Sequence, residues 1–166
     1  MIRAVISTGS NMGDSIAHLR SVTKHFAADK DTQLVATSAI YSSPAWGKTD
    51  QDGFLNQVMI IKTDRSPEDL LRECQELERQ AGRVRLEKWG PRTLDVDIIE
   101  VLSQTSEVIS DDAHLTLPHP EAKNRAFVLV PWLSIEPQAT LSGQPLSTHL
   151  EALDPEEIAA IKPLQD

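Results

Sequence analysis

The chain has 166 residues, of which 40% are hydrophobic, and a formal net charge of −9. A chain of this length buries about two thirds of its unfolded surface, so we expect one domain over residues 1–166. The net negative charge argues against a general nucleic-acid binder, because such proteins need a broad basic face. Cys74 is the only cysteine, which excludes an internal disulfide. No signal-like leader begins the chain and no apolar run approaches the roughly 20 residues of a membrane span, so we expect a cytoplasmic protein without membrane contact.

The first part of the chain predicts a strand, a helix and a second strand. Residues 2–7 are a β-branched run that stops at the turn-forming residues 8–14. Asp14 can cap a helix whose apolar residues recur near a 3.6 period. Residues 33–41 mix β-branched and apolar residues as a strand does. Residues 43–53 follow as a loop whose length is typical of functional loops.

The second part of the chain contains the clearest helix start. Residues 54–62 return to strand character, and Ser66 with Pro67 then supplies an N-cap and a first-turn proline. Gly82 is the expected stop of that helix. The remaining predicted elements are a strand at residues 94–101 and helices at residues 124–133, 146–153 and 155–161.

The order of the first six elements predicts the fold class. Strand, helix, strand, strand, helix, strand is the split βαβ arrangement. It gives an α+β domain with a mainly antiparallel sheet and helices packed on one face. Because this fold has many activities, the function has to be argued from particular residues.

The strongest local signal is the segment from Trp89 to Ile98, which contains Asp95 and Asp97. Residues two apart in a strand project from one face roughly 6 to 7 Å apart, so the two carboxylates lie side by side. Aspartate is disfavoured in strands, and a bound cation would relieve the repulsion between the pair. Oxygen ligands in this pattern suit magnesium together with substrate phosphates. From spacing alone, a solvated strand edge explains the pair equally well.

A basic loop precedes the two aspartates. Between residues 79 and 92 the sequence has one acidic residue and five cations: Arg79, Arg83, Arg85, Lys88 and Arg92. Arginine offers forked hydrogen bonds to phosphate oxygens, and phosphoryl transfer is catalysed mainly by positioning and charge. Any single one of these arginines is explained as well by a surface ion pair, so the group is the evidence.

Other candidate residues are weaker individually. His119 lies between two prolines in a non-helical turn, where a ligand contact is reasonable and zinc binding is not, since no second ligand has zinc spacing. Arg125 opens a helix whose N-terminus favours an anion. Phe54 and Phe127 can stack on a flat heterocycle or pack in the core. No P-loop motif and no Gly-x-Ser-x-Gly elbow is present.

Together these residues resemble the 6-hydroxymethyl-7,8-dihydropterin pyrophosphokinase family over nearly the whole chain. The resemblance lies in Gly9-Ser10-Asn11, Phe54-Leu55-Asn56, Gly82-Arg83-Val84-Arg85, the stretch from Trp89 to Asp97, Pro118-His119, and the run from Lys123 to Phe127. The Trp89 to Asp97 stretch is highly specific, whereas Gly-Ser-Asn alone is weak. The resemblance implies a ferredoxin-like α+β domain that transfers pyrophosphate from ATP to the pterin hydroxymethyl group and releases AMP.

The resemblance also implies roles for individual residues. Asp95 and Asp97 would hold two Mg²⁺ ions, and Arg85 and Arg92 would assist catalysis. The residues implied to surround ATP or the closing loops are Gln75, Glu78, Trp89, Ile98, Thr116, His119 and Arg125. Those implied to bind the pterin are Ser43, Pro44, Trp46, Phe54, Asn56 and Phe127. The expected partners are ATP and the pterin, with no nucleic acid and no membrane. The expected oligomeric state is a monomer. No residue is assigned as a general base.

The chain departs from the family pattern at a few positions. Phe54 replaces a common tyrosine, His114 stands at a position that is often basic, and Pro120 replaces a frequent aromatic. The loop at residues 85–89 is one residue shorter than in the best-known form of the family. Two other functions remain open on sequence grounds: a nucleotide- or pterin-binding module without turnover, and a ferredoxin-like RNA-binding module. The intact aspartate pair disfavours the first, and the net acidity with 4% aromatic residues disfavours the second.

Overall fold

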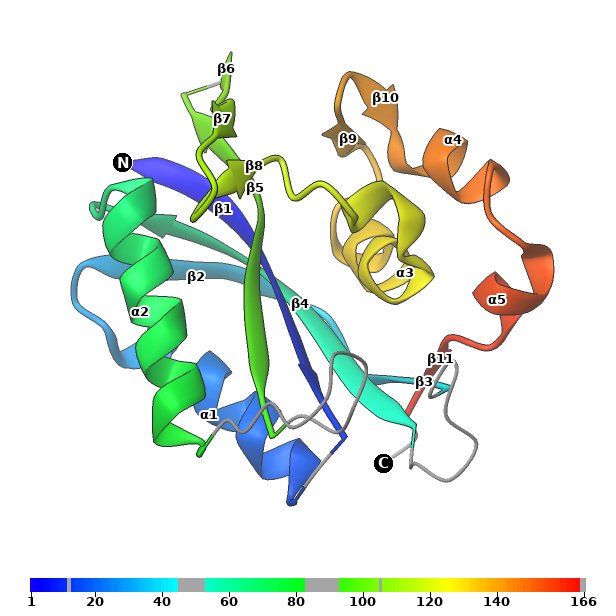
Figure 1. Ribbon diagram of the computed structural model, residues 1–166, viewed down its shortest axis with the longest axis horizontal. Helices are drawn as coiled ribbons and strands as arrows, with labels where there is room; N and C mark the ends of the chain where they lie inside the picture. The colour runs from blue at the N-terminus through cyan, green and yellow to red at the C-terminus, as the bar shows by residue number, and fades with distance from the viewer. Residues whose placement is uncertain (12, 45–52, 83–92, 105, 165–166) are drawn as a thin grey trace.

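The computed structural model describes residues 1–11, 13–44, 53–82, 93–104 and 106–164, and its centre is a sheet of three long strands (Figure 1). β1 (Ile2–Ser10) lies in the middle, and both β4 (Phe54–Thr63) and β5 (Asp95–Ser103) run antiparallel to it. The sheet order is β11-β3-β4-β1-β5-β6, and β2 also pairs with β4. The shorter strands of this sheet are β2 (Thr32–Thr37), β3 (Tyr41–Ser43), β6 (Ser106–Glu107) and β11 (Lys162–Pro163).

The remaining elements are helices and two small hairpins. The helices are α1 (Ser15–Ala28), α2 (Pro67–Gln80), the 3-10 turn η1 (Ala122–Asn124), α3 (Ala126–Ile135), α4 (Leu146–Glu151) and α5 (Pro155–Ala159). The hairpins pair β7 (Ser110–Asp111) with β8 (Thr116–Leu117) and β9 (Thr140–Leu141) with β10 (Gln144–Pro145). None of the helices within the described ranges is long and apolar enough to cross a membrane.

The helix boundaries follow the capping signals in the sequence. The Asp14 carboxylate accepts the backbone N–H of Ala17 at 3.1 Å, and the Ser66 hydroxyl accepts that of Asp69 at 3.1 Å. Each bond satisfies an amide that has no partner within the first helical turn. Gly82 follows α2 with a φ of 73°, a conformation that glycine adopts without a Cβ penalty. Both predicted helix starts and the predicted stop of α2 are confirmed.

The predicted strand at residues 33–41 is in fact two strands, β2 and β3, that both pair with β4. The break lies at Ser38. Its hydroxyl accepts the N–H of Val58 at 3.0 Å, and its carbonyl accepts the side-chain amide of Gln57 at 2.9 Å. The backbone N–H of Ser38 still donates to the carbonyl of Val58 at 2.8 Å, but side-chain hydrogen bonds take the place of the next ladder bonds, so β2 ends there.

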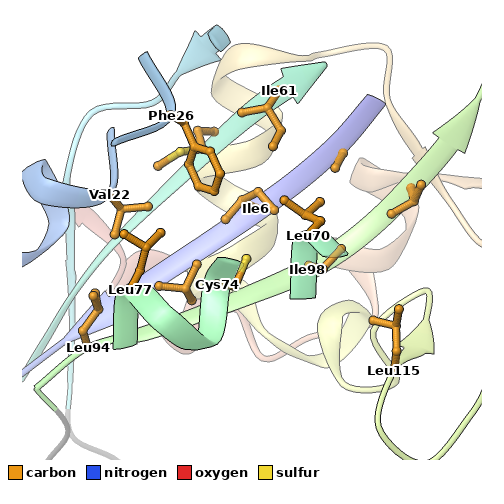
Figure 2. Close-up of a cluster of buried hydrophobic side chains, with 14 of the residues drawn as sticks. Ile6, Val22, Phe26, Ile61, Leu70, Cys74, Leu77, Leu94, Ile98 and Leu115 are labelled. Carbon is orange, nitrogen blue, oxygen red and sulfur yellow. The ribbon is translucent and has the colours of Figure 1, made fainter. Parts of the chain in front are cut away.

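Helices cover both faces of the sheet (Figure 1). α1 and α2 pack on the first face, over a core that includes Ile6, Phe26 and Cys74 (Figure 2). This arrangement confirms the predicted α+β class with a mainly antiparallel sheet, and α1 and α2 form the helical layer that was predicted on one face. The predicted helix near residues 124–133 is α3, and it adds a second layer on the opposite face, where Trp132 is fully buried. α3 is apolar on all sides, so sequence periodicity could not assign it to a face.

An ion pair joins the end of α1 to the start of α2. The guanidinium of Arg65 binds the carboxylate of Asp29, which also accepts the hydroxyl of Thr32 at 2.9 Å and the backbone N–H of Asp31 at 3.1 Å. Burial alone would raise the pKa of Asp29, but these hydrogen bonds, led by that of Arg65, outweigh it and lower the pKa from 3.8 to about 2. The pair therefore stabilises the fold only while Asp29 is ionised.

We expect acid to weaken the fold through Asp29. Because its pKa is lower in the folded than in the unfolded chain, the contribution is present above pH 4 and is lost as the pH falls towards 2, and we expect about 1 to 2 kcal/mol. Urea unfolding from pH 2 to 7 measures this loss. Asp29→Asn should unfold more easily at pH 7 and lose less stability in acid, whereas exposed Asp64→Asn should keep the native acid dependence. An unchanged acid dependence in Asp29→Asn would contradict the assignment.

Candidate functional site

The predicted site residues meet where β1 ends and β4 and β5 begin. Gly9 of β1 pairs with Asn56 on β4 and with Asp95 on β5, and Ser7 pairs with Asp97. Residues paired across an antiparallel ladder share a face of the sheet, so Asn56, Asp95 and Asp97 face the same side. This is the face that α3 covers further along the strands, where Val5 and Val58 are buried.

The two aspartates fit a magnesium site. Both are half-buried, while Val96 between them is 4% exposed and belongs to the core on the opposite face. Within the part of the chain that the structure describes, no three His, Cys, Asp or Glu residues group as metal ligands. A site with two carboxylates matches magnesium, which completes its shell with water and substrate phosphates, better than a structural zinc site, which needs four protein ligands.

Glu78 of α2 is tied to the strand that carries the aspartates. Its Oε2 accepts the backbone N–H of Val96 at 2.9 Å, between Asp95 and Asp97. The bond attaches the start of β5 to a helix that is itself held by the buried Cys74 and Leu77. It therefore fixes the backbone from which both aspartate side chains project.

Cys74 lies beneath this end of the sheet and is not a nucleophile. Burial raises the pKa of its thiol, and the negative charges of Glu78 and Asp97 raise it further. The thiolate is the reactive form of cysteine, so a fully buried thiol beside carboxylates stays protonated and inert.

Asn56 is placed by its neighbours on β3 and β1. Its side chain is 2% exposed, and Nδ2 donates to the hydroxyl of Ser43 at 2.7 Å. A Cβ at Gly9 would lie 3.1 Å from Asn56 Oδ1, and a Cβ at Gly53 would lie 2.5 Å from the carbonyl oxygen of Ser43. Glycine at both positions lets the backbones approach closely around Asn56. Neither glycine is among the individual site residues predicted from the sequence, although a glycine near the end of a strand is a signal of close approach.

Two half-buried aromatic rings stand near this end of the sheet. Phe54 is the first residue of β4 and pairs with Ser43, and Phe127 is in the first turn of α3. The guanidinium carbon of Arg125 lies 5.6 Å from the centroid of the Phe127 ring, within cation–π range. The predicted nucleotide residue Arg125 and the predicted pterin residue Phe127 are therefore in contact.

His119 is held beside β5. Its backbone N–H donates to the carbonyl of Ile99 at 2.8 Å, and its Nδ1 accepts the N–H of Glu121 at 3.1 Å. Burial lowers the pKa of the imidazole, and the nearby charge of Asp97 opposes this shift without reversing it. A neutral ring whose Nδ1 accepts a hydrogen bond carries its proton on Nε2, so we infer that Nε2–H is a donor.

The other predicted residues in the described part of the chain are either buried in the core or exposed. The side chain of Ile98 is 5% exposed and packs in the α1 and α2 core, so only its backbone could contact a ligand (Figure 2). Gln75, Pro44 and Thr116 are exposed, and the Thr116 hydroxyl donates to the carbonyl of Asp112 at 3.1 Å. His114 and Pro120 are exposed as well. Trp46, Arg83, Arg85, Lys88, Trp89 and Arg92 lie outside the described residues.

Solved structures share this fold. A Plasmodium falciparum HPPK-DHPS triple mutant with pterin and p-hydrobenzoate aligns with a TM-score of 0.64 at 12% identity. The alignment covers 98% of this chain but only 47% of that longer chain. At this identity the similarity shows the fold alone, and it agrees with the predicted α+β class.

Sequence comparison is more specific. A protein named 2-amino-4-hydroxy-6-hydroxymethyldihydropteridine pyrophosphokinase from Mycobacterium tuberculosis is 43% identical over 179 aligned positions, which cover 100% of this chain and 93% of that protein. Proteins of the same name from Methylorubrum extorquens and Haemophilus influenzae are 42% and 40% identical and cover 98% and 90% of this chain. The alignments include 100% and 91% of those two proteins. The model of the 7,8-dihydro-6-hydroxymethylpterin-pyrophosphokinase (HPPK) family matches residues 5–137. The chain therefore belongs to this family of pyrophosphokinases.

Proposed function

We propose that the chain transfers pyrophosphate from ATP to the hydroxymethyl group of 6-hydroxymethyl-7,8-dihydropterin, and that transfer takes place where β1 ends beside the starts of β4 and β5. The chain belongs to a family of ATP-dependent diphosphotransferases of folate biosynthesis. The observation that carries the placement is the register of Gly9, which sets Asn56 on one side and Asp95 on the other. A pterin-side group and a phosphate-side group thus lie on one face.

Asp95 and Asp97 are the proposed ligands of two Mg²⁺ ions, which when bound would neutralise charge on the ATP phosphates. Their half-buried side chains on one face support this role. The register supports it as well, because Asp95 and Asp97 pair with Gly9 and Ser7, whose small side groups face the same side of the sheet.

The pterin is proposed to lie between Phe54 and Phe127, which offer aromatic faces to a flat heterocycle. Asn56 would read the polar edge of the ring. Its amide is already oriented by the bond to Ser43, so little side-chain entropy remains to be lost on binding. Pro44 and Trp46 would complete this side.

The nucleotide is proposed to lie on the β5 side of the sheet. Nε2–H of His119 is a donor suited to a phosphate oxygen, and Arg125 supplies positive charge at the start of α3. Gln75, Thr116 and the backbone of Ile98 are the other proposed contacts in the described part of the chain, with Arg85, Trp89 and Arg92 in the basic loop.

The proposed reaction is one displacement at phosphorus. The hydroxymethyl oxygen of the pterin bonds to the β-phosphorus of ATP as the bond from that phosphorus to the α–β bridging oxygen breaks. The hydroxyl proton passes to water, AMP leaves with the bridging oxygen, and the pterin keeps the pyrophosphoryl group. Position and charge do most of the work in such a step, so we assign no general base.

Glu78 is proposed as a positioning residue as well as a neighbour of the nucleotide. Its bond to the Val96 N–H holds the start of β5 against α2. Groups that orient metal ligands in this way commonly matter almost as much as the ligands themselves. We further propose that residues 1–166 form one pyrophosphokinase domain that acts as a monomer in the cytoplasm.

The reaction is tested by incubating the protein with ATP, magnesium and 6-hydroxymethyl-7,8-dihydropterin and separating the nucleotides. We expect AMP and the pyrophosphorylated pterin in equal amounts, and no AMP when either the pterin or the magnesium is left out. Formation of ADP, or consumption of ATP that does not depend on the pterin, would rule out this activity. Binding of both substrates without AMP would indicate a module without turnover.

A further inference from the structure

A second group of charged residues lies at the opposite end of the face that bears Asp95 and Asp97. Glu100 of β5 pairs with Val5 of β1 and is only 6% exposed. Two residues further along β5, Leu102 pairs with Glu107 of β6. Glu100 and Glu107 are therefore diagonal neighbours on one face, with Cα atoms about 7 to 8 Å apart, within reach of two glutamate side chains.

Neither glutamate has a cation of its own in the described part of the chain. The nearby guanidinium of Arg3 binds the carboxylate of Glu136 at the end of α3, and that carboxylate also accepts the indole N–H of Trp132 at 3.0 Å. Lys62, opposite Arg3 on β4, is exposed. Oε1 of Glu107 is buried and has no hydrogen-bond partner among the residues that the structure describes. Burying a carboxylate oxygen without a hydrogen-bond donor costs free energy. A proton on a neighbouring carboxyl group could serve as that donor.

Glu100 is the group best placed to supply that proton. Burial, and then the negative charges of Glu107 and Glu136, raise the pKa of Glu100 from 4.5 to about 7, while Arg3 opposes the shift. Two carboxyl groups that cannot both ionise in a buried site share one proton and titrate as a pair.

We propose that Glu100 and Glu107 share a proton, and that this proton latches β6 onto β5 and makes the β5–β6 hairpin sensitive to pH. A backbone hydrogen bond next to Glu100 joins β5 to the residue that follows β6. The carbonyl of Val101 accepts the N–H of Val108 at 2.8 Å, directly after β6. When the proton is lost, two buried negative charges repel each other across this hairpin, and the bond to Val108 weakens.

The expected pH dependence has a definite sign. Glu100 binds its proton more tightly in the folded than in the unfolded chain, so its contribution is complete below pH 4.5 and is lost as the pH rises to about 7. The unfolding constant should rise by up to about tenfold per pH unit in this window and level off above it.

Urea unfolding from pH 5 to 8.5 measures how the unfolding constant depends on pH. Comparing three variants shows whether this dependence comes from Glu100 and Glu107 or from other groups. In Glu100→Gln the amide donates to Glu107 at every pH, so the rise should disappear and the unfolding constant at pH 8 should fall at least tenfold below that of the native chain. Glu107→Gln removes the second cause of the raised pKa of Glu100 and should make the rise smaller, whereas exposed Glu151→Gln should leave it intact. An unaltered rise in both Glu100→Gln and Glu107→Gln would overturn the proposal.

Two measurements on the unmodified chain do not depend on the variants folding. Carbon-13 NMR of the glutamate carboxyl groups should show the protonation step of Glu100 near pH 7. The hydrogen-exchange protection factor of the Val108 amide should fall across the same step. Ordinary titration of Glu100 near pH 4.5 would overturn the shared proton. Constant protection at Val108 would overturn the latch.

Discussion

Replacing Asp97 with asparagine should lower kcat by at least about a thousandfold and leave the fold intact. Asparagine has the shape of aspartate but no charge, so it loses most of its attraction for a divalent cation. A charge that neutralises phosphate oxygens is worth several kcal/mol in the transition state, and about 4 kcal/mol corresponds to a thousandfold in rate. Rates of AMP formation at saturating ATP and pterin measure the effect.

Stability measurements on the same variant separate catalysis from folding. Asp97 lies in a strand two residues from a second carboxylate, and its near-isosteric neutral replacement should still unfold cooperatively, at a temperature close to that of the native chain, when magnesium is absent. Asp111→Asn, in the exposed strand β7, is the matched control and should keep native turnover. Near-native turnover of Asp97→Asn at saturating magnesium would refute the metal assignment.

The parts of the fold that the sequence could predict depend on local physics. Asp14 and Ser66 mark the helix starts because their side chains cap amides within three residues along the chain. The side-by-side placement of Asp95 and Asp97 follows from the two-residue repeat of a strand. Each of these predictions needed only neighbours close in sequence.

The features that escaped prediction depend on contacts between distant segments. Ser38 breaks a strand because its hydroxyl meets the amide of Val58, twenty residues later. The register that places Gly9 between Asn56 and Asp95 is set by the pairing of three strands. Residue type alone also could not distinguish Ile98, whose side chain is in the core, from a ligand contact.

Removing the hydrogen bond between Glu78 and the Val96 N–H should also lower turnover strongly. Glu78→Met keeps most of the side-chain volume but cannot accept the N–H of Val96, so the start of β5 loses its attachment to α2. Loss of a group that orients metal ligands typically costs 10- to 100-fold, and we expect a fall of that size in kcat. The KM for the pterin should change much less, because Asn56 is held separately by Ser43.

Glu78→Gln distinguishes positioning from charge. Its side-chain oxygen can still accept the Val96 N–H, so this variant should recover most of the kcat lost in Glu78→Met. Hydrogen exchange of the Val96 amide provides a readout independent of activity, and it should be fast in Glu78→Met and near native in Glu78→Gln. If Glu78→Gln is as slow as Glu78→Met while Val96 stays protected, Glu78 acts through its charge, and its hydrogen bond to β5 is not what catalysis requires.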